Sequence, residues 1–293
     1  MNVRSNVNEV LAPGGISAVG EGVTFSEPGA LRRRLMVNGL RILLLVVIIG
    51  GWELGARVGV IDPFFWGQPS GIWAQIVTWA RDGTAQGPLW EQIVVTLEEA
   101  VIGFAIGVVL GVVFGVVLGR NRFLADVLGP YIKAANSIPR VTLAPLFLIA
   151  FGLGMQSKVA LAVVLVFFIV FFNAFQGVRE VDRNLLANAR ILGASNRQLS
   201  MHVIIPSALS WILASLHVSF SFALVGAVVS EFIGGIQGVG LMVQVAGANF
   251  NANGVFAAMA ILAVVALVAE GLVTWLEQRL VRWRPNQTAD ATL

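Results

Sequence analysis

The amino-acid sequence predicts an all-α fold, a polytopic bundle of about six transmembrane helices with one cytoplasmic helical loop. Composition is the first observation: 57% of the 293 residues are hydrophobic and only 12% are charged, whereas a soluble domain has roughly 25% charged residues. The second is the presence of long uncharged stretches such as 100–119 and 159–177, since about 20 apolar residues cross a bilayer as a helix. The third is a polar, arginine-bearing segment at 184–206, which lies between two apolar runs.

Six spans are expected, and charged or aromatic residues lie in or near the first two. The expected spans cover residues 38–59, 93–118, 127–152, 159–177, 204–232 and 254–276. Glu53 and Arg57 are four residues apart in the first span, which favours an intrahelical ion pair. Residues 69–79 predict a short outer interfacial helix, because tryptophans there suit the headgroup zone. Glu98 and Glu99 are expected at the outer start of the second span. Acidic side chains there would disfavour the entry of an anionic substrate nearby.

Glycines recur every fourth residue in the second span, and this spacing predicts a smooth ridge along one helix face. The ridge consists of Gly103, Gly107, Gly111 and Gly115, and Gly119 continues it. Lipid gives no hydrophobic reward for helix association, so membrane helices approach closely through small residues. Packing against another helix is therefore the expected role, with a pore-lining role as the alternative.

The third span contains Pro130, Pro139 and Pro145, each of which removes a backbone donor and kinks or breaks a helix. The freed carbonyls need partners in protein or in a water-filled cavity, so this span is expected to face the bundle interior. Pro139 and Pro145 are candidates for the lining of a pathway, or for a kink that serves only packing.

In the fifth span, Ser215 and Ser219 share one helical face and Glu231 lies at the end. Intramembrane acids are costly and usually functional, so Glu231 is a gating or substrate-side candidate, although a carboxylate near a helix end also reaches the interface. The two serines are pathway candidates, with back-bonding to the preceding helical turn as the simpler interpretation.

Basic residues set the expected orientation, because Lys and Arg are retained in cytoplasmic loops. The two chain ends and the loops after the second and fourth spans are arginine-rich, whereas only Arg57, Arg81 and Lys158 fall on the opposite side. Both termini are therefore expected in the cytoplasm. Residues 1–35 form a mobile N-terminal tail, 36–284 the membrane domain and 285–293 a C-terminal tail. The basic balance reflects topology and anionic lipid rather than nucleic acid.

The segment at 184–206 reads as a helix, a glycine turn and a second short helix. Leu185, Ala189 and Leu192 share an apolar face, while arginines seven residues apart form a stripe at positions Arg183, Arg190 and Arg197. Gly193 interrupts the first helix, and Pro206 stands at the expected start of the fifth span, where no backbone donor is needed.

This segment resembles the cytoplasmic coupling loop of binding-protein-dependent ABC importer permeases. The family signature is Glu-Ala-Ala, three residues, Gly, nine residues, Ile, one residue and Leu-Pro; Gly193 and Ala189 match it, and Ile205 with Pro206 takes the Leu-Pro place. Ala187 departs from it by standing at the glutamate position. Three further passages, beginning at 102, 136 and 230, are similar to the sulfonate, taurine and nitrate branch, so the resemblance covers roughly residues 52–284.

The resemblance implies a permease subunit in the cell membrane that carries a small solute, such as a sulfonate, taurine or nitrate. It also implies an extracytoplasmic binding protein, a second copy of this chain and two ATPase subunits that use ATP and Mg²⁺ and grip the loop at about 180–206. The expected contacts are Leu185, Ala187, Ala189, Arg190, Leu192, Gly193, Arg197 and Pro206. No catalytic residue, metal or cofactor is expected in this chain: Cys is absent, and Lys133 and Lys158 do not follow glycine as a P-loop lysine does.

Two alternatives belong to other functional classes. An ion-coupled secondary transporter or channel would have paired acids at mid-membrane and inverted repeats, and neither Lys133 nor Glu231 offers such a constellation in the sequence. An intramembrane enzyme could recruit Ser195 or Ser215 with one of the two histidines, but a nucleophile must lie within hydrogen-bond reach of its base. No motif pairs these residues.

Overall fold

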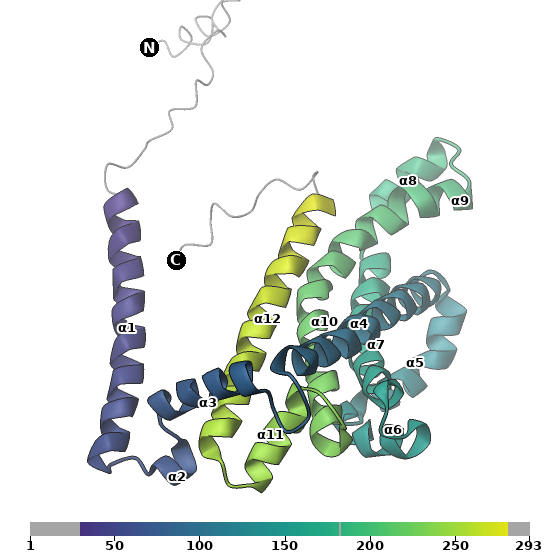
Figure 1. Ribbon diagram of the computed structural model, residues 1–293. Coiled ribbons are helices and arrows are strands. Elements are labelled where there is room, and N and C mark those ends of the chain that lie inside the picture. Colours follow the sequence, from purple (N-terminus) through teal and green to yellow (C-terminus); the bar gives the residue numbers. More distant parts are fainter. Residues whose placement is uncertain (1–29, 182, 281–293) are drawn as a thin grey trace, which may run out of the picture. The chain divides into compact units, whose positions relative to one another are not determined.

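The computed structural model describes residues 30–181 and 183–280, and the regular elements of this part are helices (Figure 1). Five described helices are long and apolar enough to cross a membrane, and a sixth crossing arises if one bent helix pair counts as a single span. The predicted all-α membrane bundle is therefore confirmed.

The elements follow one another with short connections. In chain order they are α1 (Ala30–Val58), α2 (Pro63–Trp66), α3 (Pro69–Asp82), α4 (Leu89–Arg120), α5 (Arg122–Ser137), η1 (Arg140–Leu143), α6 (Ala144–Phe151), α7 (Met155–Arg179), α8 (Arg183–Ile191), α9 (Asn196–Leu199), η2 (Ser200–Ile204), α10 (Ile205–Gly234), α11 (Val239–Ala248) and α12 (Ala252–Leu280).

The chain divides into two compact units, residues 1–51 and 52–293. In the first unit, the described residues form the greater part of α1, and their apolar side chains are exposed. Since α1 begins at Ala30, the last residues of the predicted tail at 1–35 are helical. Residues 1–29 and 281–293, which include the rest of that tail and the predicted C-terminal tail, lie outside the described part.

In the second unit, α4, α7 and α10 form the core (Figure 1). The glycine ridge of α4 lies directly against α7: a Cβ added at Gly107 would lie 2.7 Å from Cβ of Val166, and one at Gly111 would lie 2.8 Å from Cβ of Val170. Gly226 on α10 meets α7 in the same way. Small side chains thus let the three helices approach closely, as expected where lipid offers no hydrophobic reward.

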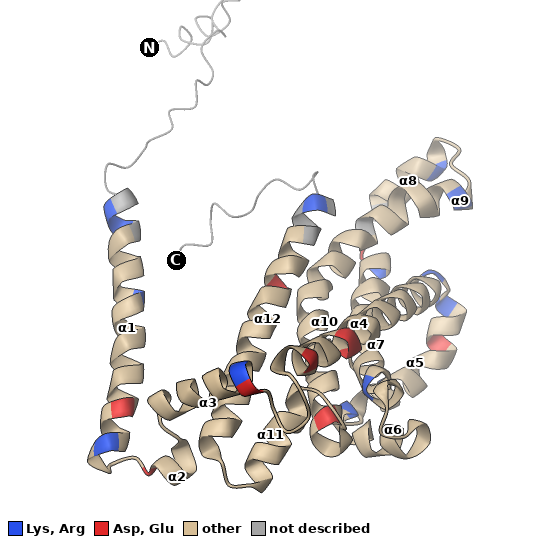
Figure 2. Cartoon of the chain, in the orientation of Figure 1, with Lys and Arg blue, Asp and Glu red and all other residues tan. Residues whose placement is uncertain are grey.

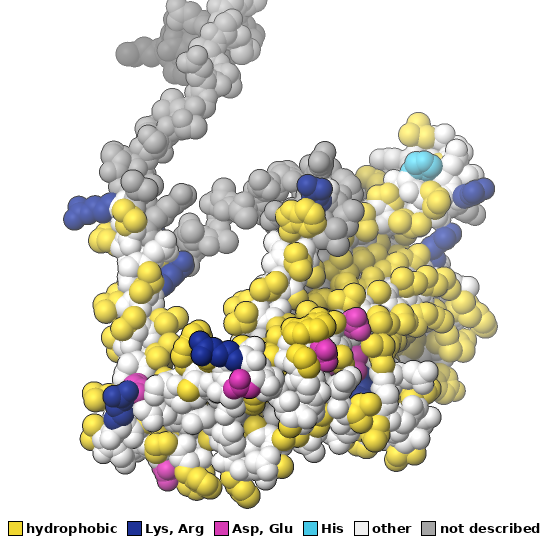
Figure 3. Space-filling model, in the orientation of Figure 1, with side chains coloured by type: hydrophobic (Ala, Val, Ile, Leu, Met, Phe, Trp, Pro, Cys, Tyr) yellow, Lys and Arg dark blue, Asp and Glu magenta, His cyan; other side chains and the backbone are white. Residues whose placement is uncertain are grey.

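The opposite face of α4 carries exposed apolar side chains, including Val109, Val113 and Val117. Figure 3 shows hydrophobic side chains over the region where Figure 1 labels α4 and α7. An exposed apolar surface on helices of this length is suited to lipid.

The predicted third span is broken rather than continuous. The helix α5 contains Pro130, η1 follows Pro139, and Pro145 lies in the first turn of α6. Ile138 takes the extended conformation that is common before a proline. The two halves bend by 83°, so the prolines break this segment instead of only kinking it.

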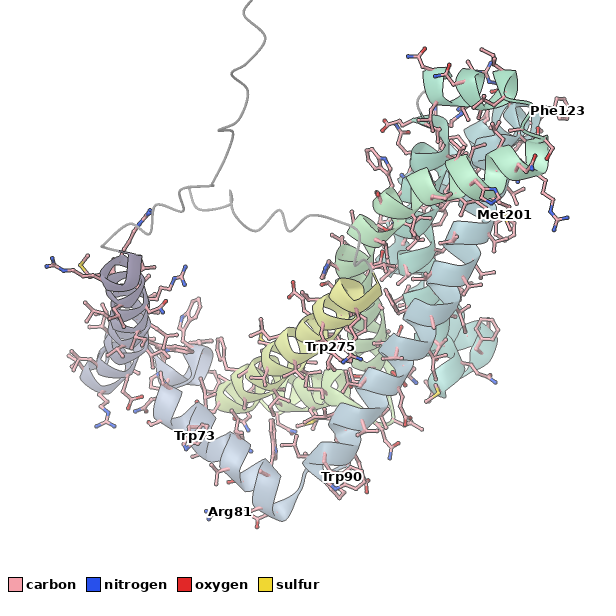
Figure 4. The ribbon with its side chains drawn as sticks, turned by 90° about the horizontal axis from the view of Figure 1, so that it is seen from above. Trp73, Arg81, Trp90, Phe123, Met201 and Trp275 are labelled. Carbon is pink, nitrogen blue, oxygen red and sulfur yellow. The ribbon has the colours of Figure 1, made fainter. Side chains whose placement is uncertain are left out.

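The short helix α3 contains the segment predicted as an outer interfacial helix. Its start is held by Glu53, whose carboxylate accepts hydrogen bonds from the Ser70 N–H and the Gln68 amide as well as from Arg57. Figure 4 shows Arg81 and Trp90, around the α3–α4 connection, at the far end of this unit from Phe123 and Met201. The latter two residues lie at the same end as α8 and α9.

Candidate functional site

The coupling loop comprises α8, α9 and the turn between them. The helix α8 ends in a Schellman motif: the Ala194 N–H donates to the Ala189 carbonyl at 3.0 Å and the Gly193 N–H to the Arg190 carbonyl at 2.9 Å. Gly193 has φ +82°, a left-handed conformation that glycine adopts without strain. The glycine turn expected from the sequence is therefore a helix C-cap.

The helix α9 begins with a capping box formed by Ser195 and Gln198. The Ser195 N–H donates to Oε1 of Gln198 at 2.8 Å, and the Gln198 N–H donates to Oγ of Ser195 at 3.3 Å. Ser195, one of the residues considered as a nucleophile, thus caps a helix. A five-residue π-helical segment, η2, then joins α9 to α10, and Pro206 lies in the first turn of α10.

The loop exposes apolar side chains beyond the ends of the long helices. Leu185 is 50% exposed, Ile191 82% and Leu192 86%, while Ala189 is half-buried. Ile191 was not among the predicted contacts. The side chain of Arg183 lies outside the described part, so only Arg190 and Arg197 of the predicted stripe can be placed, and both are exposed.

A cavity of 910 Å³ lies between the coupling loop and the ends of α4, α5 and α7, and four arginines line it. They come from three places in the chain: Arg120 and Arg122 from the α4–α5 junction, Arg179 from the end of α7 and Arg190 from α8. Ala187 also lines it. Figure 2 shows basic residues on α8 and at the α4–α5 junction.

A second group of polar residues is buried where α11 begins, and we call it the polar cluster. It comprises Gln92, Thr96 and Glu99 on α4, Lys158 on α7 and Glu231 on α10, each no more than 3% exposed. Gln92, Thr96 and Glu99 are spaced four and three residues apart, so they share the α4 face that the glycine ridge continues.

The polar cluster satisfies the N-terminal donors of α11. The Gly238 N–H donates to Oε1 of Gln92 at 2.8 Å and the Val239 N–H to Oγ1 of Thr96 at 2.9 Å. The Gly240 N–H donates to Oε2 of Glu231 at 2.6 Å. These groups have no partner within the helix, and the carboxylate also complements the positive end of the helix dipole. Neighbouring helices thus cap α11.

Thr96 and Lys158 complete the polar cluster. The Thr96 hydroxyl donates to Oε1 of Glu231 at 2.7 Å, and the Lys158 ammonium donates to the carbonyls of Leu153 and Gly154. Lys158 also interacts electrostatically with Glu99 and Glu231. The cluster thereby links α4, α10 and α11 to the connection between α6 and α7.

Sequence reasoning missed most of this group. Lys158 was assigned to an outer loop and Glu99 to the beginning of a span, but α7 already begins at Met155 and α4 at Leu89. Both residues therefore lie inside helices. No pair of acids at mid-membrane was expected around Glu231; in the described structure Glu99 and Lys158 interact with it. The available signal was the run of polar residues at positions 92, 96 and 99, on one face of an apolar helix.

The predicted pathway residues do not gather at one place in the described structure. Pro139 and Pro145 are exposed at the break between α5 and α6. Ser215 is buried and donates to the carbonyl of Ile212 at 2.6 Å, the back-bonded geometry. Oγ of Ser219 is buried and has no hydrogen-bond partner among the described residues.

The chain matches a family model with the description "Binding-protein-dependent transport system inner membrane component" over residues 107–282. This is more than half of the chain. The chain belongs to this family.

Curated relatives agree with this assignment over nearly their whole lengths. A riboflavin transport system permease protein of Chloroflexus aurantiacus is 34% identical, over 85% of this chain and 91% of the relative. A putative aliphatic sulfonates transport permease protein of Bacillus subtilis is 31% identical, over 88% and 91%. The taurine transport system permease protein of Escherichia coli is 30% identical, over 83% and 89%.

Solved structures show the same fold. A methionine ABC transporter in an inward-facing conformation matches with a TM-score of 0.51 and 21% identity, over 66% of this chain and 93% of that chain. An amino acid ABC transporter matches with a TM-score of 0.52 and 21% identity, over 64% and 92%.

The protein is thus a multi-pass inner-membrane permease subunit of an ABC importer, not an enzyme, and it forms the translocation pathway for a small solute. Family membership implies an ATPase and a binding protein as its partners. The importer assignment replaces both alternatives, the ion-coupled transporter and the intramembrane enzyme.

Proposed function

We propose that two copies of this permease form the pathway and that two ATPase subunits bind its coupling loops. ATP and Mg²⁺ are used by those subunits and not by this chain. ATP-driven movement of the loops rocks the spans between outward and inward access. An extracytoplasmic binding protein delivers the cargo.

The exposed coupling loop is the observation that carries this proposal. Leu185 and Leu192, which are large and apolar, extend beyond the long helices on a short helix that is capped at its C-terminus. An amphipathic helix of this kind is typically recognised by a hydrophobic groove in a partner. Together with Ala189 and the neighbouring Ile191, these side chains would seat in the ATPase.

The arginine-lined cavity supports the same orientation. Arg120, Arg122, Arg179 and Arg190 lie at the end of the bundle that carries the coupling loop, and basic residues are retained on the cytoplasmic side. We place the loop and both termini there, with the arginines against the surface of the ATPase or anionic lipid headgroups. A reporter that is active only in the cytoplasm should accordingly be active when it is fused to the C-terminus.

The cargo is proposed to be a small solute of the sulfonate, taurine or nitrate type. Glu99 was an argument against an anion when its position was expected at the outer start of a span. Its side chain is buried in the polar cluster, so it does not face an incoming anion, and only Glu98 of that pair is exposed. The named relatives carry different solutes at similar identity, and specificity belongs mostly to the binding protein.

The decisive experiment is purification of the tagged protein from its native membrane in mild detergent, with mass spectrometry of the proteins that accompany it. A P-loop ATPase should be recovered. Gly193→Leu should lose it, because a side chain at φ +82° strains the α8 cap, while membrane insertion stays normal.

The matched control is Gly59→Leu. Gly59 also has a positive φ, +80°, and, like Gly193, has no atom within 4 Å of an added Cβ, but it follows α1, well outside the coupling loop. This variant should keep the ATPase. Normal ATPase recovery and transport in Gly193→Leu would refute the coupling-loop assignment. The mass of the purified complex, measured by static light scattering, should correspond to two permease chains.

A further inference from the structure

Arg140 lies at the break between α5 and α6, at mid-depth in the membrane domain. Cζ of its guanidinium is 4.9 Å from the ring centroid of Phe168, and Phe168 is close to the middle of α7, which begins at Met155 and ends at Arg179. Since α7 is long and apolar enough to span a membrane, a group beside its middle lies near the centre of the bilayer.

The Arg140 guanidinium has neutral partners in the part of the chain that the structure describes. It donates a hydrogen bond to Oδ1 of Asn136 and covers the ring of Phe168, and it forms no ion pair with a described residue. A guanidinium has five N–H donors, so most of them are available to a ligand. Charged side chains at membrane depth are costly, and they usually mark a pathway or a ligand site.

The surface beside Arg140 is also polar. Asn136, Ser137 and Thr142 are exposed, and exposed Lys133 lies about one helical turn before Asn136 on the same face of α5. Cations and amides at this depth do not suit lipid. Extended backbone such as that at the break is tolerated at membrane depth only inside protein or against a water-filled cavity. This surface therefore suits a pathway between two copies of the chain.

We propose that Arg140 binds the anionic group of the cargo at mid-membrane, and that the cargo is an organic oxyanion such as a sulfonate. The inference rests on the proposed function, because the pathway lies between two copies of the permease. The planar guanidinium fork matches two oxygens of an oxyanion, and the bound cargo supplies the counter-ion that Arg140 lacks among the described residues.

Lys133 provides the next positive charge on the way to the cytoplasm. It lies on α5 between Arg140 and Arg122, and Arg122 lines the cavity beside the coupling loop. An anion released from Arg140 would thus be attracted toward the coupling-loop end. A neutral solute such as riboflavin, which is the cargo named for one relative, would leave Arg140 without a counter-ion.

The sequence contains no cysteine, so one introduced thiol can report on this surface. Ser137→Cys places it at an exposed position beside the break. The purified permease–ATPase complex is reconstituted in liposomes and labelled with anionic sulfonatoethyl methanethiosulfonate or cationic trimethylammonioethyl methanethiosulfonate. Mass spectrometry of the permease chain gives each labelling rate, without nucleotide and after trapping with ATP and vanadate. Each rate is divided by the rate of the same reagent with free cysteine.

The anionic reagent should be preferred in at least one of these two states. Arg140→Gln, made in the Ser137→Cys protein, should lower the preference by about tenfold or more, because removal of a nearby charge changes the two rates in opposite directions. Arg140→Lys should keep most of the preference. Arg279→Gln is the matched control: Arg279 also covers a ring, that of Trp275 at 4.7 Å, but near the end of α12. This variant should keep the preference in full.

A second measurement needs no change at Arg140. Ethanesulfonate should slow labelling of the Ser137→Cys protein by the anionic reagent, because it occupies the guanidinium. Dimethyl sulfone, which has a sulfonyl group but no charge, should not slow it. Ionic strength is held constant with chloride.

Four results would overturn the site: labelling by neither reagent, which would show that the surface faces lipid; equal preference for the two reagents in both states; an unchanged preference in Arg140→Gln; or equal effects of ethanesulfonate and dimethyl sulfone. Absence of an ATPase from the wild-type complex would instead overturn the proposed function. That result is seen before any thiol is introduced.

Discussion

The coupling loop and the polar cluster both satisfy backbone groups at helix ends, but they do so over different distances in the chain. In the coupling loop, the bonds of the Schellman motif and of the capping box join residues no more than five positions apart. In the polar cluster, the bonds from Gly238 to Gln92 and from Val239 to Thr96 join residues 146 and 143 positions apart.

Solvent is the second difference. The coupling loop is exposed, so water can replace a lost bond there. The polar cluster is buried among apolar helices, where a lost partner leaves a group unsatisfied at a cost of several kcal/mol at most. Substitutions in the coupling loop should therefore change ATPase binding more than they change stability. Substitutions that break long-range contacts should change stability more than ATPase binding.

The largest effect is expected at the glycine ridge, on the α4 face that continues from the polar cluster. Gly111→Leu must separate α4 from α7, because even a Cβ would lie 2.8 Å from Val170. Overpacking of this kind should cost about 3 kcal/mol or more. Membrane yield and thermal unfolding in detergent measure it. Gly129→Leu on α5 is the control, because an added Cβ there meets nothing within 4 Å. If the two variants have the same membrane yield and unfolding temperature, the contact between α4 and α7 does not depend on the glycine ridge.

Gly238→Val tests the polar cluster itself. Gly238 has φ +104° and its added Cβ would overlap the carboxylate of Glu231, so valine should destabilise the protein by about 2 to 3 kcal/mol. Gly247→Val is the control on the same helix, since its nearest neighbour is Val255 at 3.9 Å. If Gly238→Val unfolds at the same temperature as the wild type, the close packing of Gly238 on Glu231 does not contribute to stability.

Thr96→Val keeps the side-chain shape but removes the two long-range hydrogen bonds of the hydroxyl, to Val239 and Glu231, together with its bond to the Gln92 carbonyl one turn earlier. The Val239 N–H and Oε1 of Glu231 each lose a partner, which should cost about 1 to 3 kcal/mol. Thr274→Val is the matched control, because among the described residues its hydroxyl bonds only to the Glu270 carbonyl one turn earlier. A melting temperature equal to that of the control would show that α11 does not depend on its caps.

The smallest stability effect is expected at Ser195→Ala in the coupling loop. Loss of an exposed N-cap should cost about 1 kcal/mol, yet recovery of the ATPase should fall measurably because α9 frays. Calorimetric melting and quantitative co-purification separate the two effects. If stability falls as far as in Thr96→Val while ATPase recovery is unchanged, the two regions do not differ in the way proposed.

The features that could be predicted from the sequence are those set by residues close together in the chain. Apolar length predicted the long helices, the four-residue glycine spacing predicted a ridge, and the spacing around Gly193 predicted a helix, a turn and a second helix. Each of these signals is carried by neighbouring residues. The break in the third span was only half predicted: three prolines indicated a disturbance, but the 83° bend between α5 and α6 depends on how the two halves pack.

The sequence by itself determined the class of the protein, its long helices and its coupling loop, because hydrophobic length, helix caps and turn glycines act between residues close together in the chain. Only the tertiary structure decided that Glu99, Lys158 and Glu231 meet at the start of α11. Those residues come from three different helices, and a buried charge is tolerated only where the fold brings its partners together. No local pattern specifies which helices those will be.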